Sequence, residues 1–213
     1  MLEIRFDGVS QEFEGREVLH QVTCSFHAGR VTAIAGANGS GKSTLLRIAA
    51  RLMLPSSGTV DTIRDGAPVG GAEYRSMLSM ATPEMELYTR LTVRENLSFL
   101  LSARGAACGE EELKALTARV GLSSEVLSRT AGQLSTGMRQ RVRLAVLLGV
   151  DAEIWLLDEP GLALDERGRA LLMNEVRRGA ECGRLVLWAT NDREEREAAD
   201  ACIDLSCDVS GCL

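Results

Sequence analysis

Residues 36–43 combine glycines, a lysine and a serine at the spacing of a phosphate-binding loop. The segment reads Gly36-Ala-Asn-Gly-Ser-Gly41-Lys42-Ser43, so every fixed position of G-x-x-x-x-G-K-[ST] is present. Glycines let successive backbone N–H groups curve around phosphate oxygens without interference from a Cβ atom. We expect Lys42 to bridge the terminal phosphates and the Ser43 hydroxyl to bind Mg²⁺. A glycine-rich turn that matches by chance is the alternative, and the apolar run before the loop and the helical segment after it argue against it.

Two adjacent acidic residues, Asp158 and Glu159, follow a second apolar run, Ile154-Trp-Leu-Leu. Neighbouring residues on a strand point to opposite sides, so the two carboxylates can have different roles. We expect Asp158 to reach Mg²⁺ through the water shell of the ion, and Glu159 to position the attacking water or act as general base. A solvated turn is the alternative, and the loop upstream favours the catalytic interpretation.

The nucleotide-binding candidates of the glycine loop are Gly36, Asn38, Gly39, Ser40, Gly41, Lys42, Ser43 and Thr44.

Apolar runs and helical segments alternate along the chain, which indicates an α/β fold. Strands are expected at residues 2–6, 18–26, 31–35, 153–157 and 184–190. The last three are apolar enough to be buried on both faces of a sheet. The segment from 92 to 150 reads as helical and opens with a capping box at Thr92-Val-Arg-Glu95. Helices are expected at residues 43–52, 110–120, 137–150 and 165–180.

Length and charge limit the class of protein. A chain of 213 residues forms one globular unit, and its net charge of −6 argues against broad binding to nucleic acid or anionic lipid. No apolar run approaches the ~18 residues that cross a bilayer. The start, MLEIRFDGVS, lacks the positively charged segment followed by an apolar segment that is typical of a secretion signal. We therefore expect a cytoplasmic chain, so any membrane process needs another polypeptide.

Six cysteines are expected to be reduced thiols, because the chain is large and carries no secretion signal. Three of them lie five residues apart near the end, which suggests a metal site. That spacing is not the Cys-x-x-Cys spacing of a zinc knuckle, and no histidine is nearby to complete a tetrahedral set of four zinc ligands. Ordinary thiols are the preferred interpretation. The cysteines are Cys24, Cys108, Cys182, Cys202, Cys207 and Cys212.

The segment Leu134-Ser135-Thr136-Gly137-Met138-Arg139-Gln140-Arg141 resembles the signature sequence of ATP-binding cassette (ABC) ATPases, in an LS-x-G-M-x-QR form found among exporter-type members. It precedes the Asp158–Glu159 strand by the usual family distance. Ser135 and Thr136 can cap a helix that begins near Gly137, and the positive end of that helix suits a γ-phosphate. An ordinary helix N-terminus is the alternative for this motif alone. The resemblance covers essentially the whole chain.

This resemblance implies a P-loop NTPase fold of the ABC type, in which a RecA-like parallel-sheet core carries an N-terminal antiparallel β region and an inserted helical subdomain. It implies one ABC ATPase domain over residues 1–213, with a catalytic core lobe at 1–75 and 151–213 and a helical subdomain at 76–150.

The resemblance also implies a head-to-tail homodimer that encloses two ATP molecules with Mg²⁺. Each ATP would contact the phosphate-binding loop of one protomer and Ser135 and Gly137 of the other. The segment Leu162-Ala-Leu-Asp165 matches the loop that lies at this dimer contact. Phe13 falls where the family has an aromatic residue against adenine, although a Phe beside a strand is more often a core residue.

The chain departs from the family pattern at two places. Pro83 stands where a glutamine normally reaches Mg²⁺, so that contact is lost or is made by Glu84. Asn191 stands where a histidine is usual; it can donate a hydrogen bond to the γ-phosphate but cannot titrate. Asn191 with Glu194 also has the pattern of an N-cap pair opening a helix at 192–199, and both roles can coexist. These departures put turnover in doubt, not ATP binding.

The function that the resemblance implies is that of an ATP-hydrolysing subunit. It would drive a separate transmembrane permease from the inner face of the cell membrane by ATP-dependent dimer closure. No nucleic-acid partner is expected. The size resembles exporter-type subunits, in particular the small ATPase of the haem-export system of cytochrome c maturation.

Three alternatives are weaker. A nucleotide-gated module with vestigial hydrolysis would be expected to lack Glu159, which is present here. A soluble ABC ATPase acting on DNA or ribosomes usually has coiled arms, tandem cassettes or zinc modules. A kinase needs an acceptor pocket and a lid, and nothing in the sequence indicates either.

Overall fold

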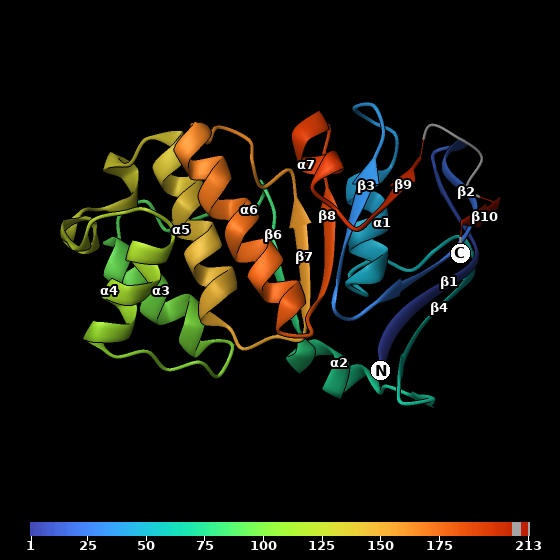
Figure 1. The fold of residues 1–213 in the computed structure, drawn as a ribbon, viewed down its shortest axis with the longest axis horizontal. Coiled ribbons are helices and arrows are strands. Elements are labelled where there is room, and N and C mark those ends of the chain that lie inside the picture. The colour runs from blue at the N-terminus through green and yellow to red at the C-terminus, as the bar shows by residue number, and fades with distance from the viewer. Residues whose placement is uncertain (206–209, 213) are drawn as a thin grey trace. The chain divides into compact units, whose positions relative to one another are not determined.

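The structure is a computed structural model that describes residues 1–205 and 210–212 (Figure 1). These residues contain ten strands, arranged in two five-stranded sheets, together with the helices. Residue contacts divide the chain into two compact units. The first unit contains residues 1–80, 153–159 and 176 onwards, and the second contains 81–152 and 160–175.

The first sheet is largely antiparallel, in the order β10-β2-β1-β4-β5. Alternate residues of β1, among them Leu2, Ile4 and Phe6, are buried, as expected of a strand with one face on a core. This is the expected N-terminal antiparallel region. The strand β4 was not predicted, because its polar sequence carries little strand signal and it is held by pairing with β1. The strands are β1 (Leu2–Phe13), β2 (Arg16–His27), β4 (Ser57–Arg64), β5 (Ala67–Pro68) and β10 (Ser210–Cys212).

The second sheet has the order β6-β7-β8-β3-β9, and β3 pairs in parallel with β8 and β9, as does β7 with β8. Every residue of β7 and β8 is buried, so the prediction of strands covered on both faces is confirmed. Because these strands are parallel, the segments that follow β3, β7 and β8 meet at the same edge of the sheet. The strands are β3 (Arg30–Ala35), β6 (Leu78–Ala81), β7 (Ile154–Asp158), β8 (Leu185–Ala189) and β9 (Ala201–Asp204).

The core of the first unit is formed where helices pack on these sheets. Leu45, Leu46 and Ile48 of α1 are fully buried among strand side chains. Gly179 of α6 makes room for an indole, since a Cβ there would lie 2.6 Å from the Trp155 ring. Tyr74 of α2 is buried, donates a hydrogen bond to the Ala49 carbonyl, and has its pKa raised to about 12 by burial. The helices of this unit are α1 (Lys42–Ala49), α2 (Gly71–Met77), the end of α6 (Glu166–Glu181) and α7 (Arg193–Glu197).

The second unit is mainly helical, as expected. The predicted capping box is present at the start of α3: Thr92 Oγ1 accepts from the N–H of Glu95 at 3.2 Å, and Glu95 Oε2 accepts from the N–H of Thr92 at 2.7 Å. Gly149 of α5 lies so close to α3 and α4 that a Cβ would be 2.7 Å from Leu101. The helices are α3 (Val93–Ser102), α4 (Glu110–Arg119) and α5 (Thr136–Gly149), with 3-10 turns η1 (Ser124–Ser128) and η2 (Ala131–Gln133).

Residues 160–175 group with the helical unit by contact, whereas the sequence placed them in the core lobe. Three side-chain contacts hold them there. Gln140 donates to the Pro160 carbonyl at 3.0 Å, Arg141 pairs with Asp165, and Arg119 pairs with Glu175. Arginine and glutamine partners of this kind lie too far away in sequence for a local pattern to reveal them.

None of the helices in the described part of the chain reaches the length and hydrophobicity of a membrane-spanning segment. Within the same residues, no group of three or more His, Cys, Asp and Glu side chains is placed to hold a metal ion. Of the three C-terminal cysteines, Cys202 is exposed, Cys207 lies outside the described residues, and Cys212 is described only by its backbone in β10.

Candidate functional site

The glycine loop leaves the end of β3 and enters α1 through Gly41, whose φ is 97°. A Cβ at Gly41 would lie 2.7 Å from Cδ2 of Leu19, and one at Gly36 would lie 2.3 Å from Oγ of Ser40. Glycine is therefore required at both positions, by backbone conformation and by space. The first N–H groups of α1 have no partner within the helix, so this end of α1 offers donors and a positive partial charge to an anion.

The Lys42 ammonium lies inside the loop and is only 5% exposed. Its Nζ donates to the carbonyl oxygens of Gly36 at 2.9 Å and Ala37 at 3.1 Å, and to Oδ1 of Asn191 at 2.7 Å. The hydrogen bonds of Lys42 all go to neutral oxygens, and its one anionic neighbour among the described contacts, Glu159, lies 4.0 Å away, so a phosphate oxygen could replace an amide oxygen and interact with the cation more strongly.

Asn191 is placed by β8 directly beside the loop, and its amide bridges three residues. Besides accepting from Lys42, it donates through Nδ2 to Oε1 of Glu159 at 3.2 Å and to Oδ1 of Asn38. The prediction that Asn191 caps the next helix is wrong. The N-cap of α7 is Asp192, whose Oδ1 accepts from the N–H of Glu194 at 2.8 Å, which leaves the Asn191 side chain available to the loop.

The acidic pair ends β7 as the sequence predicted. Asp158 is the last residue of the strand and is 2% exposed. Glu159 has a φ of 46°, a left-handed conformation that is costly for a residue with a Cβ, and its N–H is held by the Ala189 carbonyl at 2.9 Å. Its carboxylate turns toward the loop, with Oε1 4.0 Å from Lys42 Nζ. The strained turn thus brings a carboxylate to the lysine that sits in the glycine loop.

A cavity of about 390 Å³ lies over the loop in the first unit. Phe13 lines it and is 41% exposed, so it is not a core residue and its ring is available to a ligand. Val18 of β2 also lines the cavity and was not identified from the sequence, because an apolar residue in a strand carries no signal of its own. The lining residues are Phe13, Val18, Asn38, Gly39, Gly41, Lys42, Ser43, Thr44 and Glu159.

Glu84 belongs to the other unit, where it is exposed in the segment between β6 and α3. Its role as an alternative metal ligand stays a prediction.

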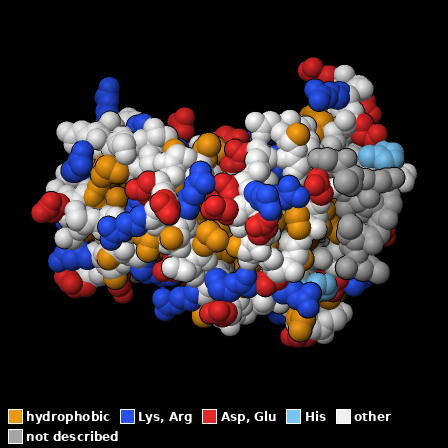
Figure 2. Space-filling model, turned by 45° about the horizontal axis from the view of Figure 1, so that its top comes forward, with side chains coloured by type: hydrophobic (Ala, Val, Ile, Leu, Met, Phe, Trp, Pro, Cys, Tyr) orange, Lys and Arg blue, Asp and Glu red, His pale blue; other side chains and the backbone are white. Residues whose placement is uncertain are grey.

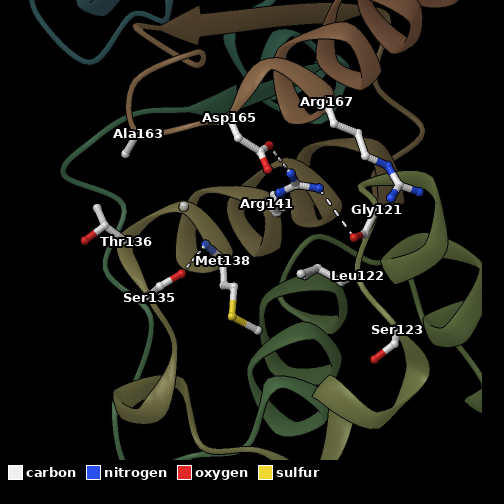
Figure 3. A pocket seen from close by; sticks show the side chains of 11 residues that line it. Gly121, Leu122, Ser123, Ser135, Thr136, Met138, Arg141, Ala163, Asp165 and Arg167 are labelled. Carbon is white, nitrogen blue, oxygen red and sulfur yellow. Dashed lines mark hydrogen bonds and ion pairs between the residues drawn. The ribbon is translucent and has the colours of Figure 1, made fainter.

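The signature segment forms a second cavity of about 650 Å³ within the helical unit (Figure 3). Ser135 is the N-cap of α5 as predicted, and its Oγ accepts from the N–H of Met138 at 3.2 Å. Gly137 passes so close to the segment before α6 that a Cβ would lie 2.7 Å from the Ala163 carbonyl oxygen. The lining residues are Gly121, Leu122, Ser123, Ser135, Thr136, Gly137, Met138, Arg141, Ala163, Asp165 and Arg167.

An ion pair stabilises the wall of this second cavity, as the dashed contacts in Figure 3 show. Arg141 donates to the Val120 carbonyl at 3.0 Å and pairs with Asp165. The Gly168 N–H, and then the charge of Arg141, hold the pKa of Asp165 below its usual range. The sequence showed Asp165 as a family match, but gave no sign that Arg141 was its partner.

Comparison with known proteins identifies the family. The sequence profile described as ABC transporter matches residues 19–161. The chain belongs to the ABC transporter family. Among similar proteins, "Probable multidrug ABC transporter ATP-binding protein YbhF" of Escherichia coli (strain K12) is 33% identical over 198 residues, which are 91% of this chain and 34% of YbhF. The sulfate/thiosulfate import ATP-binding protein CysA of Brucella melitensis is 32% identical over 213 residues, which are 96% of this chain and 59% of CysA.

This ABC chain therefore spans about a third of YbhF and about three-fifths of CysA. The fold is shared more widely. The ATP-binding cassette MJ0796, solved as a dimer in a post-hydrolysis state with ADP and Pi, superposes with a TM-score of 0.81 at 26% identity, covering 94% of this chain and 93% of that one. The predicted α/β fold of the ABC type is thus confirmed. The similar proteins include named import and multidrug systems, so the narrower resemblance to a haem exporter stays a prediction.

Proposed function

We propose that the chain binds ATP in the cavity over the glycine loop, hydrolyses it, and in this way drives an ABC transporter. One observation carries the proposal: three segments far apart in sequence bring the Lys42 ammonium, the Glu159 carboxylate and the Asn191 amide to the same loop. Their chemistry is what phosphoryl transfer to water needs, namely a cation for the phosphates, a base for the water, and a neutral donor for the transferred group.

Each of these groups has a separate task. Lys42 exchanges its neutral carbonyl partners for phosphate oxygens, which interact more strongly with a buried cation. Glu159 has a side chain that is 32% exposed, so water can reach it, and it orients that water and accepts its proton. Asn191 moves its Nδ2 donor from Asn38 and Glu159 to the terminal phosphate. Phe13 packs against the base of the nucleotide.

The oxygen donors near the loop fit Mg²⁺, which prefers hydroxyl, carboxylate, phosphate and water oxygens. Ser43 is one of the residues that line the cavity, and Asp158 has a buried side chain at the end of β7. We assign Ser43 and Asp158 to the ion, with Glu84 as a further candidate. When bound, the ion offsets the negative charge of the phosphates.

We also propose that two copies associate around two ATP molecules. The γ-phosphate bound by one copy would meet Ser135 and Gly137 of the other, where α5 begins. Two features support this. Leu162 is a large apolar residue that is 59% exposed beside the second cavity, and the similar cassette MJ0796 is itself named as a dimer bound to ADP and Pi.

The permease is proposed to be a separate transmembrane chain, with this subunit held at the inner face of the cell membrane through it. Nucleic acid is not proposed as a partner. On the face shown in Figure 2, the described basic and acidic side chains are interspersed, and the net charge of the chain is −6.

Lys42→Ala tests the proposal. We expect MgATP binding to weaken about 10- to 100-fold, because charge-assisted hydrogen bonds are lost, and hydrolysis to stop. Lys114→Ala is the matched control, since Lys114 is the only other lysine and pairs with Glu111 on the surface of α4. Titration of the purified variants with MgATP, beside thermal melts, measures both effects. Unchanged ATP affinity in the Lys42 variant with a normal melt would remove the phosphate role from this loop.

A further inference from the structure

A chain of three hydrogen bonds in the helical unit ends on the residue that follows Glu159. Gln140 of α5 donates from Nε2 to the carbonyl oxygen of Pro160 at 3.0 Å. Arg143, one turn further along α5, donates from Nη1 to Oε1 of the same Gln140 at 3.1 Å and from Nε to the Met85 carbonyl at 2.6 Å. Gln140 is 5% exposed and Pro160 is buried, so solvent does not compete for the contact between these two residues.

The arginine decides which way the glutamine amide faces. A guanidinium group only donates hydrogen bonds, so the side of the amide next to Arg143 must be the oxygen. The amide nitrogen is then directed to the opposite side, where the Pro160 carbonyl accepts its hydrogen bond. The second hydrogen bond of Arg143, to Met85, fixes the guanidinium itself. Burial, and then the Arg139 charge, lower the pKa of Arg143.

The backbone at Glu159 needs such support. Its φ of 46° is strained for a residue with a Cβ and persists only where neighbouring contacts impose it. On the N-terminal side, the Glu159 N–H is bound to the Ala189 carbonyl. On the C-terminal side, the next carbonyl, that of Pro160, is held by Gln140. Neither the glycine loop nor the signature cavity accounts for Arg143.

We propose that Arg143 is a positioning residue for hydrolysis: it orients Gln140, which holds the Pro160 carbonyl and so keeps Glu159 in its strained, reactive conformation. The inference rests on the proposed function of Glu159. The same hydrogen bonds also include the segment that follows Pro83 and Glu84, because the Met85 carbonyl accepts from the Arg143 guanidinium.

Arg143→Met removes the donors and keeps the apolar stem. We expect the rate of single-turnover ATP cleavage to fall on the order of 10- to 100-fold, as for a slightly misplaced catalytic group, while MgATP affinity changes less than about two-fold. Arg143→Lys, which keeps a cationic donor, should recover part of the rate. Arg129→Met is the matched control, because Arg129 also donates to a backbone carbonyl in this unit, that of Gln133.

Gln140→Glu is the second variant, in case Arg143→Met does not fold. It has the same shape and still pairs with Arg143, but it has no donor for the Pro160 carbonyl, so it should show the same loss. In the double variant, the two effects should not multiply, since both residues act on one carbonyl.

Hydrogen exchange of the 158–164 peptide, which needs no nucleotide, should speed up in the Arg143 and Gln140 variants and not in the Arg129 control. Wild-type exchange and wild-type cleavage in both variants would overturn the inference and leave the proposed function standing. A wild-type chain that neither binds nor cleaves ATP would instead overturn the proposed function. Multiplying effects in the double variant would show that Arg143 does not act through Gln140.

Discussion

Asn191 joins a cation and an anion of the first cavity with one neutral side chain. Its oxygen accepts from Lys42 at 2.7 Å and its nitrogen donates to Glu159 at 3.2 Å, because an amide carries an acceptor and a donor on the same group. An amide does not titrate, so this bridge holds across the pH range in which an imidazole would change charge. The position that normally carries histidine in the family therefore keeps its hydrogen bonds but loses its response to pH.

We predict that Asn191→Ala slows single-turnover ATP cleavage without a large loss of stability, because Asp192, not Asn191, caps α7. Asp192→Ala is the control with the opposite profile: it should cost about 1 kcal/mol in unfolding free energy and leave cleavage nearly unchanged. Asn191→His should sustain cleavage and add a pH dependence near the imidazole pKa of about 6.5. Equal cleavage by wild type and Asn191→Ala would contradict the phosphate-sensing role.

At the scale of one element, the start of α3 shows how a helix end is stabilised by reciprocal contacts. The Thr92 hydroxyl and the Glu95 carboxylate each satisfy a backbone N–H of the other residue. The backbone N–H of Thr92, and then its hydroxyl, lower the pKa of Glu95. The folded state therefore favours the charged carboxylate, and this contribution is present above the ordinary pKa of 4.5 and is lost as the pH falls through the lowered value.

We predict that Thr92→Ala lowers the free energy of unfolding by about 1 kcal/mol at neutral pH, and that Thr92→Ser restores most of the loss. Glu95→Gln should also destabilise at neutral pH but approach wild type in acid, where wild-type Glu95 is itself protonated. Denaturant unfolding at neutral and acid pH measures both. An effect of Glu95→Gln that is the same at both pH values would show that the carboxylate charge does not contribute.

At the scale of the whole molecule, each of the two cavities supplies half of an ATP site in the proposed dimer. The first cavity offers the lysine, the glycine loop and Glu159, and the second offers the N-terminus of α5 with Ser135 and Gly137. ATP would join the two from different copies, and hydrolysis would release them.

We predict that Glu159→Gln keeps ATP binding, loses hydrolysis and accumulates as an ATP-bound dimer. The amide preserves the size of the side chain but cannot accept a proton from water. Size-exclusion chromatography with and without MgATP measures the change, and the Glu159→Gln, Lys42→Ala double variant, which should stay monomeric, is the control. A Glu159→Gln variant that remains monomeric at saturating MgATP would argue against the sandwiched dimer.

Local patterns were sufficient for the features whose physics is local. The glycine loop could be predicted because backbone conformation and phosphate contact are encoded within residues 36–43. The buried strands β3, β7 and β8 were readable from their continuous apolar runs, and the capping box of α3 from residues three apart. The same physics explains why the acidic pair could be assigned to the end of a strand.

Only the tertiary structure decided which distant residues meet. Lys42 and Asn191 are 149 residues apart and Gln140 and Pro160 are 20 apart, and no local pattern encodes those contacts. The misassigned helix cap is an example: Asn191 and Asp192 are equally good caps by sequence, but in the structure Asp192 caps α7 while the Asn191 side chain accepts from Lys42. Parallel pairing of β3, β7 and β8 brings their ends together, so the sequence determined the parts of the site and the sheet decided their arrangement.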